Sequence, residues 1–139
     1  MGDIRMFDIN QLIEKFNLKA FVETGTFHGE AVEFMKDKFK EIHSIEINKE
    51  LALECTTKFR DLKHIHIHNG NSYECLPNIL NQINTNILFW LDAHFPGADA
   101  HKAAYDEEVN LEKRLPLENE LDIISKRQNK FKDVIYPFM

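Results

Sequence analysis

The chain has 139 residues, of which 43% are hydrophobic and 29% are charged, and its formal net charge at pH 7 is -6. These proportions are typical of one globular domain, and an acidic chain is a poor partner for nucleic acid because Lys and Arg drive phosphate binding. No apolar run is long enough to span a bilayer, and residues 1–16 lack a signal-peptide pattern, so we expect a cytoplasmic protein with no membrane partner. Cys55 and Cys75 fall in helical patterns, which indicates reduced structural thiols.

Helical and strand patterns alternate along the chain. The predicted elements, in order, are a helix over 9–16 behind the N-cap Asp8, a strand over 20–22, a helix over about 30–39, a strand over 42–47, a helix over 51–62, a strand over 64–68, a helix over 72–83, a strand over 87–91, an irregular stretch over 93–116, a helix from about 117 and a strand over 133–136. This order predicts one α/β domain over 1–139, a Rossmann-like three-layer sandwich with a mainly parallel sheet of about five strands. The alternating strand over 64–68 is expected at an edge, and the apolar strand over 87–91 is expected to be central.

Polar residues follow each of the first four predicted strands, where an open parallel sheet binds ligands. Gly25 permits a tight turn, and Gly29 lets a helix N-terminus approach a ligand closely. The backbone N–H groups between them suit a carboxylate or a phosphate. Because this glycine spacing is common, two glycines that only turn the chain are an equally good interpretation.

The second and third strands end in further candidate ligand-binding residues. Glu46 stands about 20 residues after Gly25, a spacing at which a carboxylate can accept hydrogen bonds from a ribose diol. Asn71 and Ser72 can bind a purine edge or cap the next helix, and the sequence does not separate the two roles.

Asp92 and His94 follow the fourth strand, and the same Asp-Ala-His triplet recurs at 99–101. Asp92 and His94 can act as acid/base groups or as ligands of a divalent metal. We favour a functional role for Asp92, whereas His94 is as well explained by a solvated side chain. Solvation is the preferred interpretation for Asp99 and His101.

Taken together, these motifs resemble the successive motifs of class I S-adenosylmethionine-dependent methyltransferases, over about Ala20 to Ile135. The stretches Trp90-Leu91-Asp92-Ala93-His94 and Pro116-Leu117-Glu118-Asn119-Glu120-Leu121 are similar to a group of small bacterial methyltransferases. The resemblance implies S-adenosylmethionine as cofactor and methyl transfer to a small molecule, such as a sugar or another hydroxylated metabolite.

The resemblance also implies a role for each matched residue. Glu23, Thr24, Gly25, Thr26, Phe27 and Gly29 would border the methionine part of the cofactor, Glu46 would hold the ribose, Asn71 and Ser72 would meet the adenine, and Asp92 and His94 would face the methyl group and the acceptor. Asp92 would contact the cofactor as well, and Asp92 and His94 are therefore the catalytic candidates. Asp92, His94 and Glu120 are weaker candidates for holding a divalent metal.

Three features depart from the family pattern. Phe27 stands where the family often has glycine, Asn71 replaces the commoner Asp, and the chain stops at Met139, where family members continue through two more strands. An exposed sheet edge would follow, which suits pairing with a second copy in a homodimer. The alternative function is a truncated, catalytically inactive cofactor-binding or interaction domain. A nicotinamide-dependent oxidoreductase is disfavoured because residues 25–29 lack the G-x-G-x-x-G spacing.

Three other groups have less specific interpretations. For His64, His66 and His68, solvated or edge-packed side chains are preferred to a metal site. The basic stretch of Lys126, Arg127, Lys130 and Lys132 is best explained as a solvated helix end and loop. Glu120 either approaches His94 or lies on the exposed face of an amphipathic helix.

Overall fold

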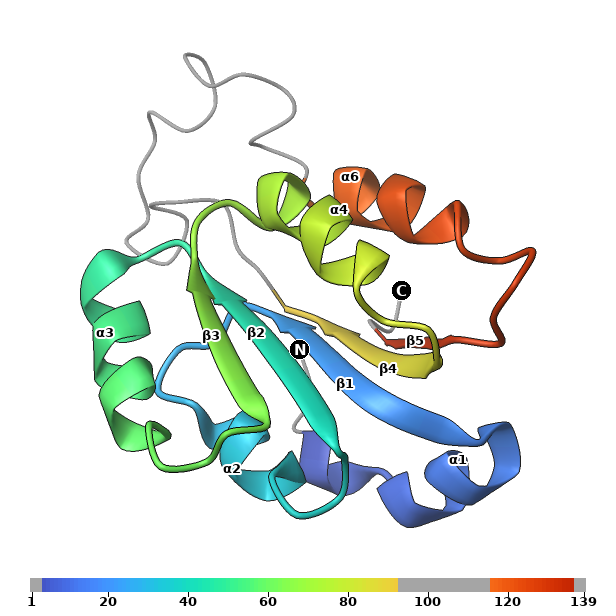
Figure 1. The fold of residues 1–139 in the computed structure, drawn as a ribbon, viewed down its shortest axis with the longest axis horizontal. Helices are drawn as coiled ribbons and strands as arrows, with labels where there is room; N and C mark the ends of the chain where they lie inside the picture. The colour runs from blue at the N-terminus through green and yellow to red at the C-terminus, as the bar shows by residue number, and fades with distance from the viewer. Residues whose placement is uncertain (1–3, 93–115, 137–139) are drawn as a thin grey trace.

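The computed structural model describes residues 4–92 and 116–136, in which a parallel sheet lies between two layers of helices (Figure 1). The elements in chain order are η1 (Ile4–Met6), α1 (Ile9–Phe16), β1 (Leu18–Thr24), α2 (Glu30–Met35), β2 (Glu41–Glu46), α3 (Lys49–Lys58), β3 (Ile65–Asn69), α4 (Ser72–Asn81), β4 (Asn86–Leu91), α6 (Pro116–Ser125) and β5 (Val134–Tyr136). The predicted α/β class, the parallel sheet and the predicted strands are confirmed. The predicted irregular stretch over 93–116 lies almost wholly outside the described residues.

The strand order in the sheet is β3-β2-β1-β4-β5, and every neighbouring pair is parallel. The chain runs outward from β1 to β3 and then returns to place β4 on the other side of β1. The order therefore switches between β1 and β4, and the crevice beyond their carboxyl ends is where this architecture binds ligands.

Alternation of side chains along β1 divides the core into two clusters, one on each face of the sheet. Phe21 packs with the cluster that contains residues of α1, α2 and α3. Its neighbours Ala20 and Val22 pack with residues of α4 and α6 on the other face. Figure 1 shows these two helical layers on opposite sides of the strands. The fold therefore leaves the strand ends, rather than the strand faces, available for a ligand.

Several predicted boundaries differ from the structure by a few residues, and tertiary contacts explain two of the differences. Helix α2 ends at Met35, so Phe39 lies beyond it, and Phe39 is buried because its ring packs on Phe21 with centroids 5.7 Å apart. Strand β3 begins at Ile65, so His64 precedes the strand, and its Nε2 atom lies 2.6 Å from the carbonyl oxygen of Lys36. Phe39 and His64 each continue the pattern of the neighbouring helix or strand in the sequence. Both lie outside that element, and a contact with a distant part of the chain holds each of them in place.

The prediction that the third strand lies at a sheet edge is confirmed, and its histidines pack there against β2. The ring of His43 stacks on those of His66 and His68, with centroids 4.7 and 5.2 Å apart. His43 Nδ1 lies 3.0 Å from His68 Nε2, and its Nε2 lies 2.8 Å from a Glu41 oxygen. Burial lowers the pKa of His43, and burial together with the neighbouring rings lowers the pKa of His68 to about 4.

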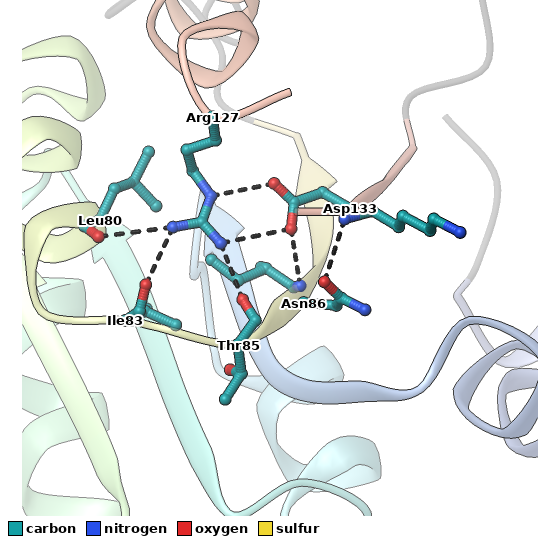
Figure 2. Close-up of polar contacts among 8 residues, drawn as sticks. Leu80, Ile83, Thr85, Asn86, Arg127 and Asp133 are labelled. Carbon is teal, nitrogen blue, oxygen red and sulfur yellow. Dashed lines mark hydrogen bonds and ion pairs between the residues drawn. The ribbon is translucent and has the colours of Figure 1, made fainter. Parts of the chain in front are cut away.

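The sequence suggested that Arg127 belongs to a solvated basic stretch, and this is wrong. Its side chain is buried between the end of α4 and the start of β4. Figure 2 shows the guanidinium group between the carbonyl oxygens of Leu80, Ile83 and Thr85 and the carboxylate of Asp133. The Arg127 Nε atom lies 2.9 Å from Asp133 Oδ2 (Figure 2). Asp133 Oδ1 also accepts from the Ile87 backbone N–H at 2.8 Å. This pair joins the segment after α6 to the start of β4.

No described helix is both long and apolar enough to cross a membrane.

Candidate functional site

The loop between β1 and α2 adopts an unusual backbone conformation. Gly25, Phe27 and Gly29 all have positive φ angles, of 86°, 52° and 83°. Glycine adopts this region freely, whereas a bulky L-residue such as Phe27 is strained in it. A glycine at this position would adopt the same conformation without strain.

Two contacts hold Phe27 in this strained conformation. The Phe27 backbone N–H donates to Glu46 Oε1 at 2.8 Å, and the Cys55 thiol donates to the Phe27 carbonyl oxygen at 3.2 Å. Because strained backbone persists only where its surroundings determine it, the loop depends on β2 and α3 for its shape.

Glu46 uses both of its carboxylate oxygens on backbone groups. Besides Phe27, it accepts from the Asn48 N–H at 2.9 Å through Oε2, and the residue is 6% exposed. The carboxylate therefore braces the β1–α2 loop against the turn after β2. A carboxylate can accept further hydrogen bonds, so the contact with a ribose diol stays a prediction.

Gly29 faces the protein rather than the space beyond the strands. A Cβ atom at this position would lie 2.9 Å from the Phe59 ring and 3.2 Å from Cys55 Sγ, both on the α3 side. The absence of a side chain thus permits close packing of the loop on α3. The sequence suggested that Gly29 lets a ligand approach closely. The structure gives another reason for the glycine, which is its close packing on Phe59 and Cys55.

Glu23 is a buried carboxyl group at the end of β1, and it is 2% exposed. Ser44 Oγ donates to Glu23 Oε1 at 2.6 Å, and Ser44 Oγ lies 2.6 Å from Thr26 Oγ1. Burial raises the pKa of Glu23 to about 8 despite the Ser44 bond, and the charges of Asp92 and Glu46 add to the rise. Glu23 is therefore mostly protonated at neutral pH.

A pocket of about 340 Å³ lies at the carboxyl ends of β1 and β4. This volume is at the lower end of small-molecule sites. The pocket brings together five of the predicted cofactor-binding residues, namely Glu23, Gly25, Thr26, Phe27 and Asp92, and it is also lined by Ile4, His28, Glu30, Ala31 and Trp90.

Trp90 was predicted only as part of a core strand, and it forms a wall of the pocket. Its ring packs on Phe7 and Tyr136, with centroids 6.2 and 6.1 Å apart. Ser44, which orients Glu23, was also missed. Ser44 could have been found only from the strand register, because Glu23 pairs with Ser44 across β1 and β2. This register cannot be derived from one sequence.

A second polar cluster at the carboxyl end of β1 consists of Thr24, Ser72 and Glu120. Thr24 is fully buried, and its hydroxyl donates to Glu120 Oε1 at 3.2 Å. The Ser72 hydroxyl donates to Glu120 Oε2, while Asn71, the N-cap of α4, donates its side-chain amide to Glu74 at 2.6 Å. The structure thus places Asn71 and Ser72 at the start of α4, and neither is among the residues that line the pocket described above.

Glu120 is 1% exposed, so its placement on an exposed helix face is wrong. The predicted approach to His94 lies outside the described residues, as do His94, Asp99 and His101. Within residues 4–92 and 116–136, no three His, Cys, Asp or Glu side chains are grouped to hold a metal ion.

Neither a protein-family model nor a curated protein sequence matches this chain significantly. Solved structures do match. A protein from Klebsiella pneumoniae assigned as an O-methyltransferase superimposes with a TM-score of 0.57 and 11% identity, over 90% of this chain and 70% of that one. An rRNA methylase from Streptococcus thermophilus gives a TM-score of 0.57 and 11% identity, over 98% of this chain and 72% of that one.

A third match, from Streptococcus mutans, is a protein assigned as a methyltransferase and solved with S-adenosylhomocysteine. It gives a TM-score of 0.54 and 9% identity, over 95% of this chain and 69% of that one. At such identities the likeness concerns the fold. The chain has the Rossmann-like fold of class I S-adenosylmethionine-dependent methyltransferases, as the resemblance in the sequence predicted.

Proposed function

We propose that this chain is an S-adenosylmethionine-dependent methyltransferase whose cofactor enters the pocket beyond β1 and β4. The observation that carries the proposal is the chemistry of the pocket, which combines the carboxyl groups of Glu23, Glu30 and Asp92 with the aromatic side chains of Phe27 and Trp90. The fold supports the proposal, because solved methyltransferases share it.

These residues fit the charge of the proposed cofactor. The methionine part of S-adenosylmethionine carries an ammonium group and a sulfonium group, and both favour nearby carboxylates and aromatic faces. In the free protein, burial and the neighbouring carboxylates of Asp92 and Glu46 keep a proton on Glu23. A cation in the pocket would favour the ionised form, so we expect the cofactor to displace this proton.

The cofactor supplies an electrophilic methyl group, and the protein has to orient the acceptor and accept its proton. Asp92 lies in the pocket directly after β4, and we propose that it takes the proton from an acceptor hydroxyl. A general base of this kind has to lie within hydrogen-bond reach of the hydroxyl. His94, the second predicted catalytic residue, stays a prediction.

Calorimetric titration with S-adenosylmethionine and S-adenosylhomocysteine, with NAD as a negative control, tests the proposal. We expect micromolar binding of the adenosyl ligands, which corresponds to about -8 kcal/mol. Glu23→Gln should weaken S-adenosylmethionine more than S-adenosylhomocysteine, because only the former carries the sulfonium charge. Glu14→Gln makes the same chemical change on the exposed side of α1 and should alter neither affinity.

Proton release gives an independent readout of the same contact. At pH 7, titrations in two buffers of different ionisation enthalpy should show that wild-type protein releases protons on binding S-adenosylmethionine and that Glu23→Gln releases fewer. Folded protein that binds neither adenosyl ligand, or that binds NAD equally well, would exclude the proposed function.

The acceptor that we propose is a small hydroxylated molecule, such as a sugar. The net charge of -6 supports a small molecule rather than a nucleic acid. Formation of S-adenosylhomocysteine can be measured with a panel of sugars and other hydroxylated metabolites in one arm and ribosomal RNA fragments in the other. Turnover in the RNA arm alone would refute this choice of acceptor, even if the cofactor binds as proposed.

A further inference from the structure

Glu120 is a buried acid beside the apolar core between the sheet and the helices α4 and α6. It lies on the same face of α6 as Ile124, four residues further along, which is a fully buried member of the apolar cluster between the sheet, α4 and α6. Burying a carboxyl group is costly, and a leucine would fill a similar volume without that cost. The glutamate at this position is therefore not explained by packing alone.

The contacts of Glu120 join three elements at the carboxyl end of the sheet. The residue belongs to α6, and its two oxygens accept from Thr24 at the end of β1 and from Ser72 at the start of α4. These partners are 96 and 48 residues away in the sequence. The carboxyl group therefore fixes the positions of two chain segments that local structure does not connect.

Thr24 extends this network to the residue that we propose as the base. A hydroxyl has a single hydrogen, which Thr24 donates to Glu120, so its lone pairs are left to accept. The backbone N–H of Asp92 points at this hydroxyl at 3.2 Å and at the Thr24 carbonyl oxygen at 2.9 Å. The direction of each hydrogen bond from Asp92 through Thr24 to Glu120 is thus determined.

We propose that Glu120 is a positioning residue, which places Asp92 through Thr24 and the first turn of α4 through Ser72. It touches neither the pocket nor a substrate, and its effect on the cofactor site rests on the function proposed above. The geometry itself concerns only this chain, and it can be tested without any ligand.

The first test measures hydrogen exchange at the Asp92 amide in wild type, Glu120→Gln and Glu120→Leu. Glutamine can accept from Thr24 and donate to the Ser72 hydroxyl, so we expect exchange within about twofold of wild type. Leucine fills the space but leaves Thr24 without its acceptor, and we expect exchange at Asp92 to be about tenfold faster. Equal exchange in all three proteins would overturn the proposal, whether or not the protein binds a cofactor.

The second test measures the affinity for S-adenosylhomocysteine in the same variants. We expect a loss of about tenfold for Glu120→Leu and recovery in Glu120→Gln. Thr24→Val should weaken binding in the same way, whereas Thr24→Ser, its matched control, keeps the hydroxyl and should bind normally. An affinity in Glu120→Gln as weak as that in Glu120→Leu would contradict positioning through these bonds.

A destabilised protein could also bind weakly, and Arg127→Met controls for this effect. Arg127 is also buried, but it contacts Thr85, just before β4, and Asp133 rather than residues of the pocket. We expect it to lower stability without changing the affinity of the folded protein. If wild type itself binds no adenosyl ligand, the proposed function fails, and the exchange measurement still decides the role of Glu120.

Discussion

Replacing Glu23 with glutamine removes the ionisable group at the pocket while preserving its size and its acceptor for the Ser44 hydroxyl. Burial raises the pKa of Glu23 from 4.5 to about 8. The folded protein therefore keeps a proton on Glu23 at pH values where the unfolded chain has lost it. Because the folded state binds more protons, the stability due to this group is highest at low pH and falls as the pH rises from 4.5 towards 8.

The two pKa values set the size of the effect. Between pH 5 and pH 7, this titration should lower the free energy of unfolding of the wild type by about 2–3 kcal/mol, because each pH unit within the window contributes up to about 1.4 kcal/mol. Glutamine has no proton to lose. We therefore expect the stability of Glu23→Gln relative to wild type to rise by about 2–3 kcal/mol between pH 5 and pH 7.

Urea unfolding followed by circular dichroism at pH 5, 6 and 7 measures this difference. Glu120, whose pKa is raised by burial to about 7, titrates in both proteins, so its contribution cancels. Glu14→Gln should show no gap that grows with pH. If the gap between Glu23→Gln and wild type stays constant over the range, Glu23 does not carry the raised pKa, and the charge argument for the cofactor fails with it.

Other predictions concern the packing around the sheet. Arg127→Met should lower the free energy of unfolding by about 3–5 kcal/mol, because it leaves the buried Asp133 carboxylate without its partner; urea unfolding at pH 7 measures this, and a loss below 1 kcal/mol would contradict it. Gly29→Ala should destabilise by about 1–2 kcal/mol, because its positive φ is strained for alanine and the new Cβ would press on Phe59; an unchanged melting temperature would count against this. His68→Gln should reduce the loss of stability on acidification from pH 6.5 to about 4, the window set by its lowered pKa; identical acid-unfolding curves would refute that assignment.

Much of the fold follows from local patterns along the chain. The alternation of strand and helix periods predicts a parallel sheet with a helix layer on each face, since parallel strands need crossover connections. The cap at Asp8 is also a local matter, because its side chain accepts from the Gln11 N–H within the same turn. The alternating pattern at residues 64–68 likewise indicated an edge strand, because its partly exposed face could be seen in its own residues.

The site is less predictable, because its residues act in pairs that are distant in the sequence. That Glu23 and Asp92 would lie near the same pocket could be inferred, since the ends of parallel strands meet at one edge of a sheet. That Glu46 braces Phe27, and that Ser72 and Thr24 both donate to Glu120, could not be inferred. These contacts depend on the path of each loop, for which a strand pattern contains no information.

The sequence by itself determined the class of fold, the order of its elements and the set of polar residues at the strand ends. Only the tertiary structure decided which charged groups are buried. Glu120 and Arg127 look like surface residues in the sequence, and they are buried because distant hydroxyl, carbonyl and carboxylate groups satisfy them. The free energy of burying a charge depends on such partners, and the partners are brought together only when the chain folds.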